Sequence, residues 1–217
     1  MVATAVRIAD EEGLAGVTMR RVAAAFGVAT MSLYGGVGGK GALVLAMIDV
    51  AMADAVPSGV RTSAGWRQRL DLGARTQWAA YRLHPWLAEV ISLTQAQPVP
   101  SLVRFGEWNL AALARSGLDP VARFDVHLLI CNYVRGLAIN LSAEERLLAD
   151  SGLDPDSFAG EPNPVLHSMM RDYPALAAAG DYPFDLDRLF AFGLDRLLDG
   201  VAPLTSGGAG GSPAPPR

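Results

Sequence analysis

The sequence contains one cysteine, Cys131, among 217 residues. A single thiol excludes an intramolecular disulfide and is typical of a protein in a reducing compartment. Long apolar runs are also lacking, because four charged or histidine side chains interrupt the most apolar stretch, residues 121–141. The first residues lack the apolar core of a signal peptide. These absences predict a soluble, cytoplasmic protein.

An excess of basic charge is missing as well. The net charge is −4 and the sequence pI is about 5.3. In residues 1–50 four basic side chains balance four acidic ones, so residues 51–217 carry the net negative charge. Any nucleic-acid binding must therefore depend on a local field and not on the charge of the whole molecule.

Alternation of apolar and polar residues, the pattern of strands, is absent, and apolar residues recur with helical spacing instead. With 51% hydrophobic residues the chain can build one large or two small helical domains, so we expect an all-α fold. Helices are expected at residues 2–12, 19–26, 30–35, 40–55, 66–83, 85–93, 102–115, 117–142, 165–171, 175–179 and 184–201. Residues 149–164 are rich in Asp, Ser, Gly and Pro, which predicts a loop.

The sharpest local pattern lies between Val17 and Tyr34. Two short helices that cross steeply need a small residue in the first helix and a glycine in the turn, and Ala23 and Gly27 provide them. Thr18 is a suitable N-cap for the first helix. The apolar side chains expected to fill the space between the helices are Val22, Phe26, Val28 and Leu33. This pattern predicts a helix-turn-helix; the alternative is a three-helix packing unit without a role in DNA binding.

The second of these helices carries the groups that suit a DNA groove. Thr30 and Ser32 are small hydrogen-bonding residues, and Tyr34 is placed to reach a phosphate. Arg20 and Arg21, at the start of the first helix, can reach the DNA backbone.

From Val6 to Met47 the chain resembles the DNA-binding domain of TetR-type transcription regulators. The resemblance lies in residues 7–13, in residues 32–34, and in Val37 and Lys40. It implies that Arg20, Thr30, Ser32, Tyr34 and Lys40 contact DNA, with Met31 among them and able to touch a thymine methyl group. The complete set of expected DNA-binding residues is Thr18, Arg20, Arg21, Thr30, Met31, Ser32, Tyr34 and Lys40.

Three later segments, residues 84–87, 133–136 and 192–200, resemble the tetracycline-repressor-like C-terminal domain of that family. The resemblance reaches about Leu204 and implies a homodimeric repressor that a small-molecule effector releases from a double-stranded DNA operator. We expect a DNA-binding domain at residues 1–56 and a ligand-binding and dimerisation domain at residues 57–204. The Gly-, Ser- and Pro-rich tail at residues 205–217 is expected to be disordered.

Two departures from the family pattern predict weaker DNA binding than is typical. Gly35 and Gly36 follow Tyr34 where the family usually has aromatic or basic residues, and three further glycines lie nearby. Each glycine within a helix costs about 0.5–1 kcal/mol relative to alanine. The chain also begins almost at the first helix, so the basic arm that often precedes it is absent or trimmed. A dimeric helical binding protein that has lost DNA recognition is therefore the alternative function.

The dimer is expected from one helix with too much apolar surface for a single partner. Residues 121–141 are apolar nearly all round, so one side can face the core of its own subunit and the other a second subunit. The final helix carries an apolar stripe from Leu186 to Val201, with Arg188, Asp195 and Asp199 on its other side. The family resemblance implies that these two helices pair across a two-fold axis as a four-helix bundle. A helix wholly buried in a monomer is the alternative.

Aromatic and polar residues of the central helices have the composition of a small-molecule pocket. The expected ligand-binding residues are Trp78, His84, Trp86, Trp108, Asn109, His127 and Cys131. Each of them could also simply fill the core, and Trp86, which follows His84-Pro85, could instead mark the junction between two helices.

An enzyme is a further alternative, because His127 and Cys131 are four residues apart and share a helix face. They could form a thiolate–imidazole pair or, with His84 or His167, a metal site. No second cysteine, His-x-x-x-His pair or glycine-rich phosphate loop supports catalysis. We therefore expect no enzyme activity, no metal and no cofactor, with His127 a half-buried histidine and Cys131 a small core residue.

Overall fold

The computed structural model describes residues 1–57, 64–92, 94–151, 173–178 and 185–206. Every regular element in these ranges is helical, which confirms the expected all-α fold. The elements are α1 (Val2–Gly16), α2 (Met19–Phe26), α3 (Thr30–Val37), α4 (Lys40–Met52), the 3₁₀ turn η1 (Ala53–Ala55), α5 (Trp66–Leu83), α6 (Leu87–Val90), α7 (Pro100–Ala112), α8 (Pro120–Ser151), α11 (Pro174–Ala177) and α12 (Leu186–Ser206).

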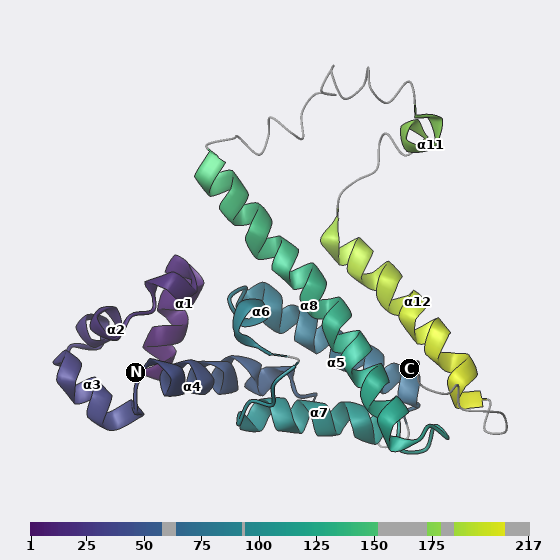
Figure 1. Ribbon diagram of the computed structural model, residues 1–217, viewed down its shortest axis with the longest axis horizontal. Helices are drawn as coiled ribbons and strands as arrows, with labels where there is room; N and C mark the ends of the chain where they lie inside the picture. The colour runs from purple at the N-terminus through teal and green to yellow at the C-terminus, as the bar shows by residue number, and fades with distance from the viewer. Residues whose placement is uncertain (58–63, 93, 152–172, 179–184, 207–217) are drawn as a thin grey trace, which may run out of the picture.

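Helices α1 to α3 form a small unit at one end of the molecule, and α4 leads from it to the larger group of helices (Figure 1). The first helix, expected to stop at Gly13, is broken there, because the φ of +71° at Gly13 lies outside the helical region, but one more turn follows to Gly16. The Thr18 hydroxyl caps α2 by accepting a hydrogen bond from the backbone N–H of Arg21 at 3.1 Å. Gly27 ends α2 with a φ of +77°, a left-handed conformation that glycine adopts without the penalty a Cβ imposes.

The core of this N-terminal unit differs from expectation at two positions. Val17, Val22, Ala23 and Leu33 are buried, but Phe26 is 49% and Val28 is 40% exposed, so the prediction that both fill the space between α2 and α3 was wrong. The buried stripe of α2 is made by Met19, Val22 and Ala23. Phe26, at the last position of the helix, and Val28, in the turn, both lie beyond that stripe.

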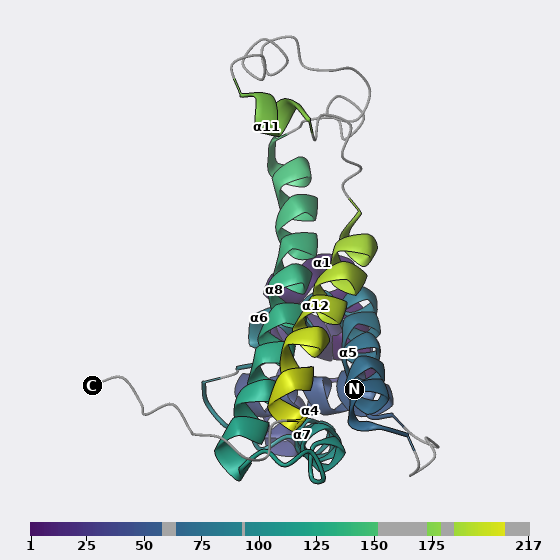
Figure 2. The ribbon, with the colours of Figure 1, turned by 90° about the vertical axis from the view of Figure 1, so that its right-hand side faces the viewer.

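The larger group of helices places α5 and α7 beside α8, with α12 along the length of α8. In both views α8 and α12 run side by side (Figures 1 and 2). Their packing is close at one point, where the Tyr133 hydroxyl of α8 donates to the carbonyl oxygen of Leu189 on α12 at 2.7 Å. One continuous core of buried apolar residues runs from α1 through α4 to α5, α8 and α12.

Several helix ends differ from the sequence prediction. The segment after His84-Pro85 is helical only over the four residues of α6, α7 begins at Pro100 and ends at Ala112, and α8 continues to Ser151 instead of ending near residue 142. Pro100 occupies the first turn of α7, where its missing N–H has no intrahelical partner to lose. Helix α12 extends into the predicted tail as far as Ser206. The helix predicted at residues 165–171 lies outside the described residues, as do most of the loop predicted at residues 149–164 and residues 207–217 of the tail.

Within the described ranges, no single helix is long and apolar enough to cross a membrane. Helices α3 and α4, extended by η1, meet the length and composition criteria only as a pair, with a 67° bend at the break between them.

Candidate functional sites

Helix α3 turns one residue inward and a row of residues outward. Leu33 is only 2% exposed and anchors the helix in the core, whereas Met31 is 81% and Tyr34 is 49% exposed. Ser32 is exposed beside them, and Thr30 is half-buried at the first position of the helix. Four predicted DNA-binding residues thus occupy one short helix, with three of their side chains open to solvent.

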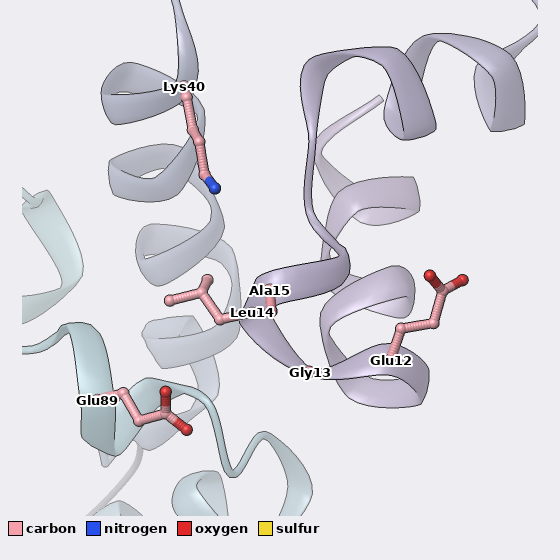
Figure 3. A pocket seen from close by; sticks show the side chains of 6 residues that line it. All are labelled: Glu12, Gly13, Leu14, Ala15, Lys40 and Glu89. Carbon is pink, nitrogen blue, oxygen red and sulfur yellow. The ribbon is translucent and has the colours of Figure 1, made fainter.

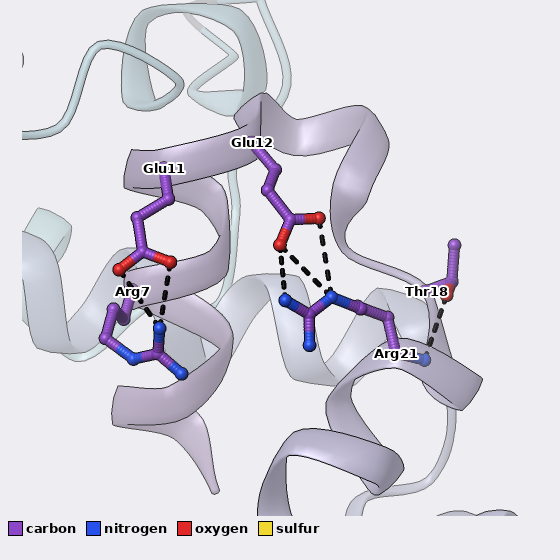
Figure 4. Close-up of polar contacts among 5 residues, drawn as sticks. All are labelled: Arg7, Glu11, Glu12, Thr18 and Arg21. Carbon is purple, nitrogen blue, oxygen red and sulfur yellow. Dashed lines mark hydrogen bonds and ion pairs between the residues drawn. The ribbon is translucent and has the colours of Figure 1, made fainter.

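Two of the predicted DNA-binding residues also hold the N-terminal unit together. The Arg21 guanidinium binds the Glu12 carboxylate, with Nη2 2.5 Å from Oε1 (Figure 4). Its hydrogen bonds to Glu12 and the carboxylate charge raise the pKa of Arg21 above its ordinary value. Thr18 caps α2, as described above. Arg21 therefore fixes α2 against α1 and Thr18 stabilises the start of α2, which leaves Arg20, exposed at the second position of α2, as the better candidate for contact with a DNA phosphate.

Lys40 lies at the start of α4 and borders a hollow between α1, α4 and α6 (Figure 3). The hollow has a volume of about 400 Å³ and is lined by Glu12, Gly13, Leu14, Ala15, Lys40 and Glu89. The kinked end of α1 is therefore not packed against α6 on this side.

The glycine-rich turn between α3 and α4 contains two kinds of glycine. Gly38 and Gly39 have φ values of +74° and +107° and make the turn possible. Gly35 and Gly36 lie within α3, and a Cβ at either would meet no atom within 4 Å. The structure therefore requires glycine at Gly38 and Gly39 but offers room for a side chain at Gly35 and Gly36.

Three of the seven predicted ligand-binding residues come together between α7 and α8. Asn109 of α7 lies 3.3 Å from His127 of α8, between Nδ2 and Nδ1, and the same His127 nitrogen is 3.6 Å from Cys131 Sγ. Burial lowers the pKa of His127 and raises the pKa of Cys131 to about 12. The pair is thus a neutral imidazole and a neutral thiol, which does not support the thiolate–imidazole alternative.

A metal site has no support in the described part of the chain, where no three His, Cys, Asp or Glu side chains gather around one point. His167, one candidate for the third ligand, lies outside the described residues. His84, the other candidate, binds a residue of α1 instead.

Two buried polar residues next to this cluster were missed by the sequence analysis. Gln77 and Tyr81 of α5 are both buried, and Gln77 Nε2 donates to the Tyr81 hydroxyl at 3.2 Å. Among the described residues Gln77 Oε1 has no hydrogen-bond partner. The signal was present in the sequence, because Leu70, Ala74, Gln77 and Tyr81 follow one helix face and a glutamine in such an apolar stripe is unusual.

The two predicted tryptophans on α5 and α7 have their indole N–H groups occupied. Trp78 Nε1 donates to Asp187 Oδ1 of α12 at 2.6 Å, and its ring stacks on Phe190 with 5.1 Å between centroids. This hydrogen bond, together with Arg82, holds the pKa of Asp187 below its ordinary value. Trp108 Nε1 donates to the Arg69 carbonyl oxygen at 3.3 Å. Both indoles would offer a ligand an aromatic surface, but their N–H groups already donate within the protein and are not available to the ligand.

The remaining two predicted ligand-binding residues, His84 and Trp86, lie where α1 meets the larger group of helices. His84 Nδ1 is 2.8 Å from Asp10 Oδ1, and Trp86 Nε1 donates to the same oxygen at 2.7 Å. The structure thus places them at the helix junction, the second role considered for Trp86.

Family models match both the part of the chain that carries the predicted DNA-binding residues and the part that carries the predicted ligand-binding residues. Residues 1–47 match the family model described as bacterial regulatory proteins, tetR family, and residues 60–204 match the tetracyclin repressor-like C-terminal domain. The chain belongs to the TetR family. It is therefore a helix-turn-helix transcription regulator, and the resemblance found in its sequence is confirmed.

Two relatives of this TetR-family chain come from Streptomyces. The HTH-type transcriptional repressor DrrR1 of Streptomyces coeruleorubidus is 36% identical over 212 residues, which cover 95% of this chain and 77% of DrrR1. A possible TetR-family regulator from Streptomyces coelicolor A3(2) has a TM-score of 0.70 and 27% identity, over 94% of this chain and 97% of that one.

The fold is also that of ActR from Streptomyces coelicolor. Apo ActR has a TM-score of 0.74 and 23% identity over 96% of this chain and 95% of ActR. ActR in complex with actinorhodin has a TM-score of 0.71 and 22% identity over 96% of each chain.

Proposed function

We propose that this TetR-family regulator is a homodimeric repressor that a small apolar effector releases from its operator. The observation that carries the proposal is the outward row of α3, where Met31, Ser32 and Tyr34 are exposed while Leu33 is buried. A short helix that keeps a large aromatic and a methionine in solvent suits insertion into a major groove. The 36% identical relative DrrR1 is a repressor, which favours repression over activation.

Gel shift or fluorescence anisotropy with the DNA that flanks the gene tests the DNA-binding part. Replacing Tyr34 by Ala is expected to weaken binding about tenfold, the value of one good hydrogen bond to a charged phosphate. Tyr173→Ala is the matched control, because Tyr173 is also exposed but precedes α11, far from α3. Equal operator affinity for both variants would contradict the placement of the recognition helix.

The dimer interface is proposed on the outer faces of α8 and α12. Val121, Phe124 and Leu129 of α8 and Leu189 and Phe192 of α12 are exposed large apolar residues. On α8, Val121 and Phe124 lie three residues apart and share a face, and Leu129 widens the exposed apolar surface, which suits a second copy of the same two helices. A dimer would place two copies of α3 roughly 34–36 Å apart, one turn of DNA.

Light scattering tests this interface. The native chain is expected to have the mass of a dimer, and Phe124→Glu is expected to give a monomer. Val103→Glu is the control, since Val103 is also exposed but lies on α7. A monomeric native chain, or a dimer unaffected by Phe124→Glu, would disprove the proposed interface.

The effector is proposed to bind among α5, α7 and α8. Gln77, Asn109 and His127 would supply polar contacts, and the indole rings of Trp78 and Trp108 apolar walls. Operator release can be followed while planar apolar compounds are added, beginning with actinorhodin, which ActR binds. Asn109→Leu is expected to abolish the response to any compound that acts. A complex that persists with every compound would refute the ligand-responsive part of the proposal.

A second candidate function keeps the dimer and the effector but lacks DNA binding. Gly35 and Gly36 favour it, because these two positions of α3 carry no side chain where the family usually has large residues. The same gel shift separates the two functions: a native chain without affinity for the flanking DNA at low salt supports the second. We propose no catalytic role for either.

A further inference from the structure

One carboxylate of the N-terminal unit accepts two hydrogen bonds from the larger group of helices. Asp10 lies on α1, and its Oδ1 is 2.8 Å from His84 Nδ1 and 2.7 Å from Trp86 Nε1. His84 and Trp86 flank Pro85 in the short segment between α5 and α6. The Trp86 side chain is only 2% exposed, so its N–H points from the core toward α1. We call these three residues the Asp10 latch.

Packing alone does not hold α1 against this segment. The hollow of about 400 Å³ separates the residues after Gly13 from Glu89 of α6 (Figure 3). On that side, the orientation of α1 depends on the bonds that Asp10 accepts and on the contact of α1 with α4. Ala5, Ile8 and Ala9 of α1 are buried in the continuous core that α1 shares with α4, so a change in those bonds would alter the tilt of α1 together with α4.

The latch is also connected to the helices that carry the proposed effector site. Trp86 directly precedes α6, whose Leu87 and Ala88 are completely buried. The Ala88 carbonyl oxygen accepts a hydrogen bond from Arg135 Nε of α8 at 2.8 Å. A continuous series of contacts thus runs from α8 through α6 to Asp10 on α1.

We propose that Asp10 is a positioning residue for operator binding. Its carboxylate holds α1, and with it α2 and α3, at the tilt at which both recognition helices of a dimer meet their half-sites. Without the latch each DNA-binding unit samples more orientations. Only the fraction of molecules with both units in the orientation that fits the operator can bind, so the apparent affinity for the operator is lower. This inference rests on the proposed binding of a dimer to the operator. It assigns to Asp10, His84 and Trp86 the control of how the DNA-binding unit is oriented relative to the larger group of helices.

The geometry provides a conservative replacement and a control on the same helix. Both donors reach the same oxygen, Oδ1, so Asp10→Asn keeps an acceptor for each of them, whereas Asp10→Ala removes it. Glu11, the next residue, pairs with Arg7 within α1 (Figure 4). Glu11→Ala therefore removes a carboxylate from α1 without touching the latch.

Operator affinity of the full-length chain is the first readout. Asp10→Ala is expected to bind the flanking DNA about tenfold more weakly than the native chain. Asp10→Asn should stay within about threefold of the native affinity, and so should Glu11→Ala. Trp86→Phe, which removes only one donor and keeps a ring in the core, is expected to fall between them. It also replaces Asp10→Ala as the decisive variant if that protein does not fold.

A second readout measures orientation directly. A spin label on Ala24→Cys, an exposed position of α2, reports the distance between the two DNA-binding units of a dimer, while the native Cys131 is buried. The native chain and Asp10→Asn are expected to give one narrow distance distribution, and Asp10→Ala a broad one. A general loss of stability would not broaden the distances in a folded dimer, so the distance distribution separates a positioning role from a merely structural one.

The outcomes separate this inference from the function on which it rests. If the native chain has no affinity for DNA, or if the spin labels give no distance between protomers because no dimer forms, the proposed function is overturned and the latch with it. A native dimer that binds DNA, with Asp10→Ala equal to it or tighter in affinity, overturns the latch alone. Weaker binding by Asp10→Ala that Asn restores, together with broader distances, supports it.

Discussion

Tyr133 of α8 and Gly193 of α12 are in direct contact. A Cβ placed on Gly193 would lie 2.1 Å from the Tyr133 hydroxyl oxygen and 2.5 Å from the ring carbon that bears it. The hydroxyl crosses to α12, where it donates to the carbonyl oxygen of Leu189. Two segments that resembled the family in the sequence, residues 133–136 and 192–200, thus meet where the two longest C-terminal helices approach each other.

Gly193→Ala is therefore expected to destabilise the protein by roughly 1–3 kcal/mol, the usual cost of overpacking. The ring of Tyr133 would have to move away and give up its hydrogen bonds to α12. Tyr133→Leu provides the space, so the double variant should lose less than the sum of the two single losses. Denaturant unfolding of the four proteins measures this, and additive losses would show that the contact does not limit the approach of α12.

The sequence predicted the helices of the N-terminal unit better than the core between them. Gly27 and Thr18 act locally, one through its backbone conformation and the other through a cap, so their roles were visible in the sequence. The exposure of Phe26 depends on where its helix ends relative to the helix it packs against. The spacing of residues along one helix does not determine that position. The break of α1 at Gly13 was predicted for the same local reason as Gly27, but the further turn to Gly16 was not.

The candidate sites divide in the same way. The exposed residues of α3 follow from one buried leucine and the helical period. His84 and Trp86 were assigned to a ligand because aromatic composition is common to pockets and to domain junctions, and only the fold brings Asp10 to them. The pairing of Gln77 with Tyr81 follows the four-residue spacing of one helix, but its position beside Cys131 of α8 required two helices to be placed.

The two kinds of glycine around the end of α3 predict opposite effects of the same substitution. Gly36→Ala should stabilise the protein by about 0.5–1 kcal/mol, because its Cβ meets nothing and alanine favours the helix. Gly38→Ala should destabilise it by roughly 1 kcal/mol or more, since alanine is strained at a φ of +74°. Urea midpoints of both variants and the native chain test the pair. Two changes of the same sign would contradict the described turn.

Cys131 is expected to be chemically inert in the folded protein. Burial raises its pKa to about 12, so at pH 8 only about one thiol in ten thousand is ionised. The same thiol in unfolded chain, with a pKa near 9.0, should react about a thousandfold faster with a disulfide reagent. Comparable rates in buffer and in guanidinium would show that the thiol is accessible.

The raised pKa of Cys131 also has a consequence for stability. The unfolded chain releases the thiol proton near pH 9 and the folded chain only near pH 12. The contribution of the buried thiol to the free energy of unfolding is therefore complete below pH 9. It is lost as the pH rises from 9 to 12, because the unfolded chain is then stabilised by releasing its proton. Cys131→Ala should therefore lose less stability than the native chain between pH 9 and pH 10. Parallel pH profiles for the two proteins would contradict this.

Asp49 joins α4, the last helix of the predicted DNA-binding domain, to the start of α7. Its Oδ1 accepts the backbone N–H of Ser101 at 2.7 Å, directly after Pro100 has begun the helix. A carboxylate at this place satisfies one of the free N–H groups of the first turn and faces the positive end of the helix dipole. The bond therefore ties α4 to α7 and stabilises α7 itself.

Asp49→Ala is expected to lower the free energy of unfolding by about 1–2 kcal/mol, the range for loss of a cap, because the Ser101 N–H is left without its acceptor. Asp49→Asn keeps an acceptor and loses only the charge, so it should cost about half as much. Asp54→Ala is the control, since Asp54 is exposed in η1, the 3₁₀ turn that follows α4, and should change stability by less than about 0.5 kcal/mol. If Asp49→Ala were as stable as Asp54→Ala, the start of α7 would not depend on α4. Movement of α4 would then reach the C-terminal helices through apolar packing alone.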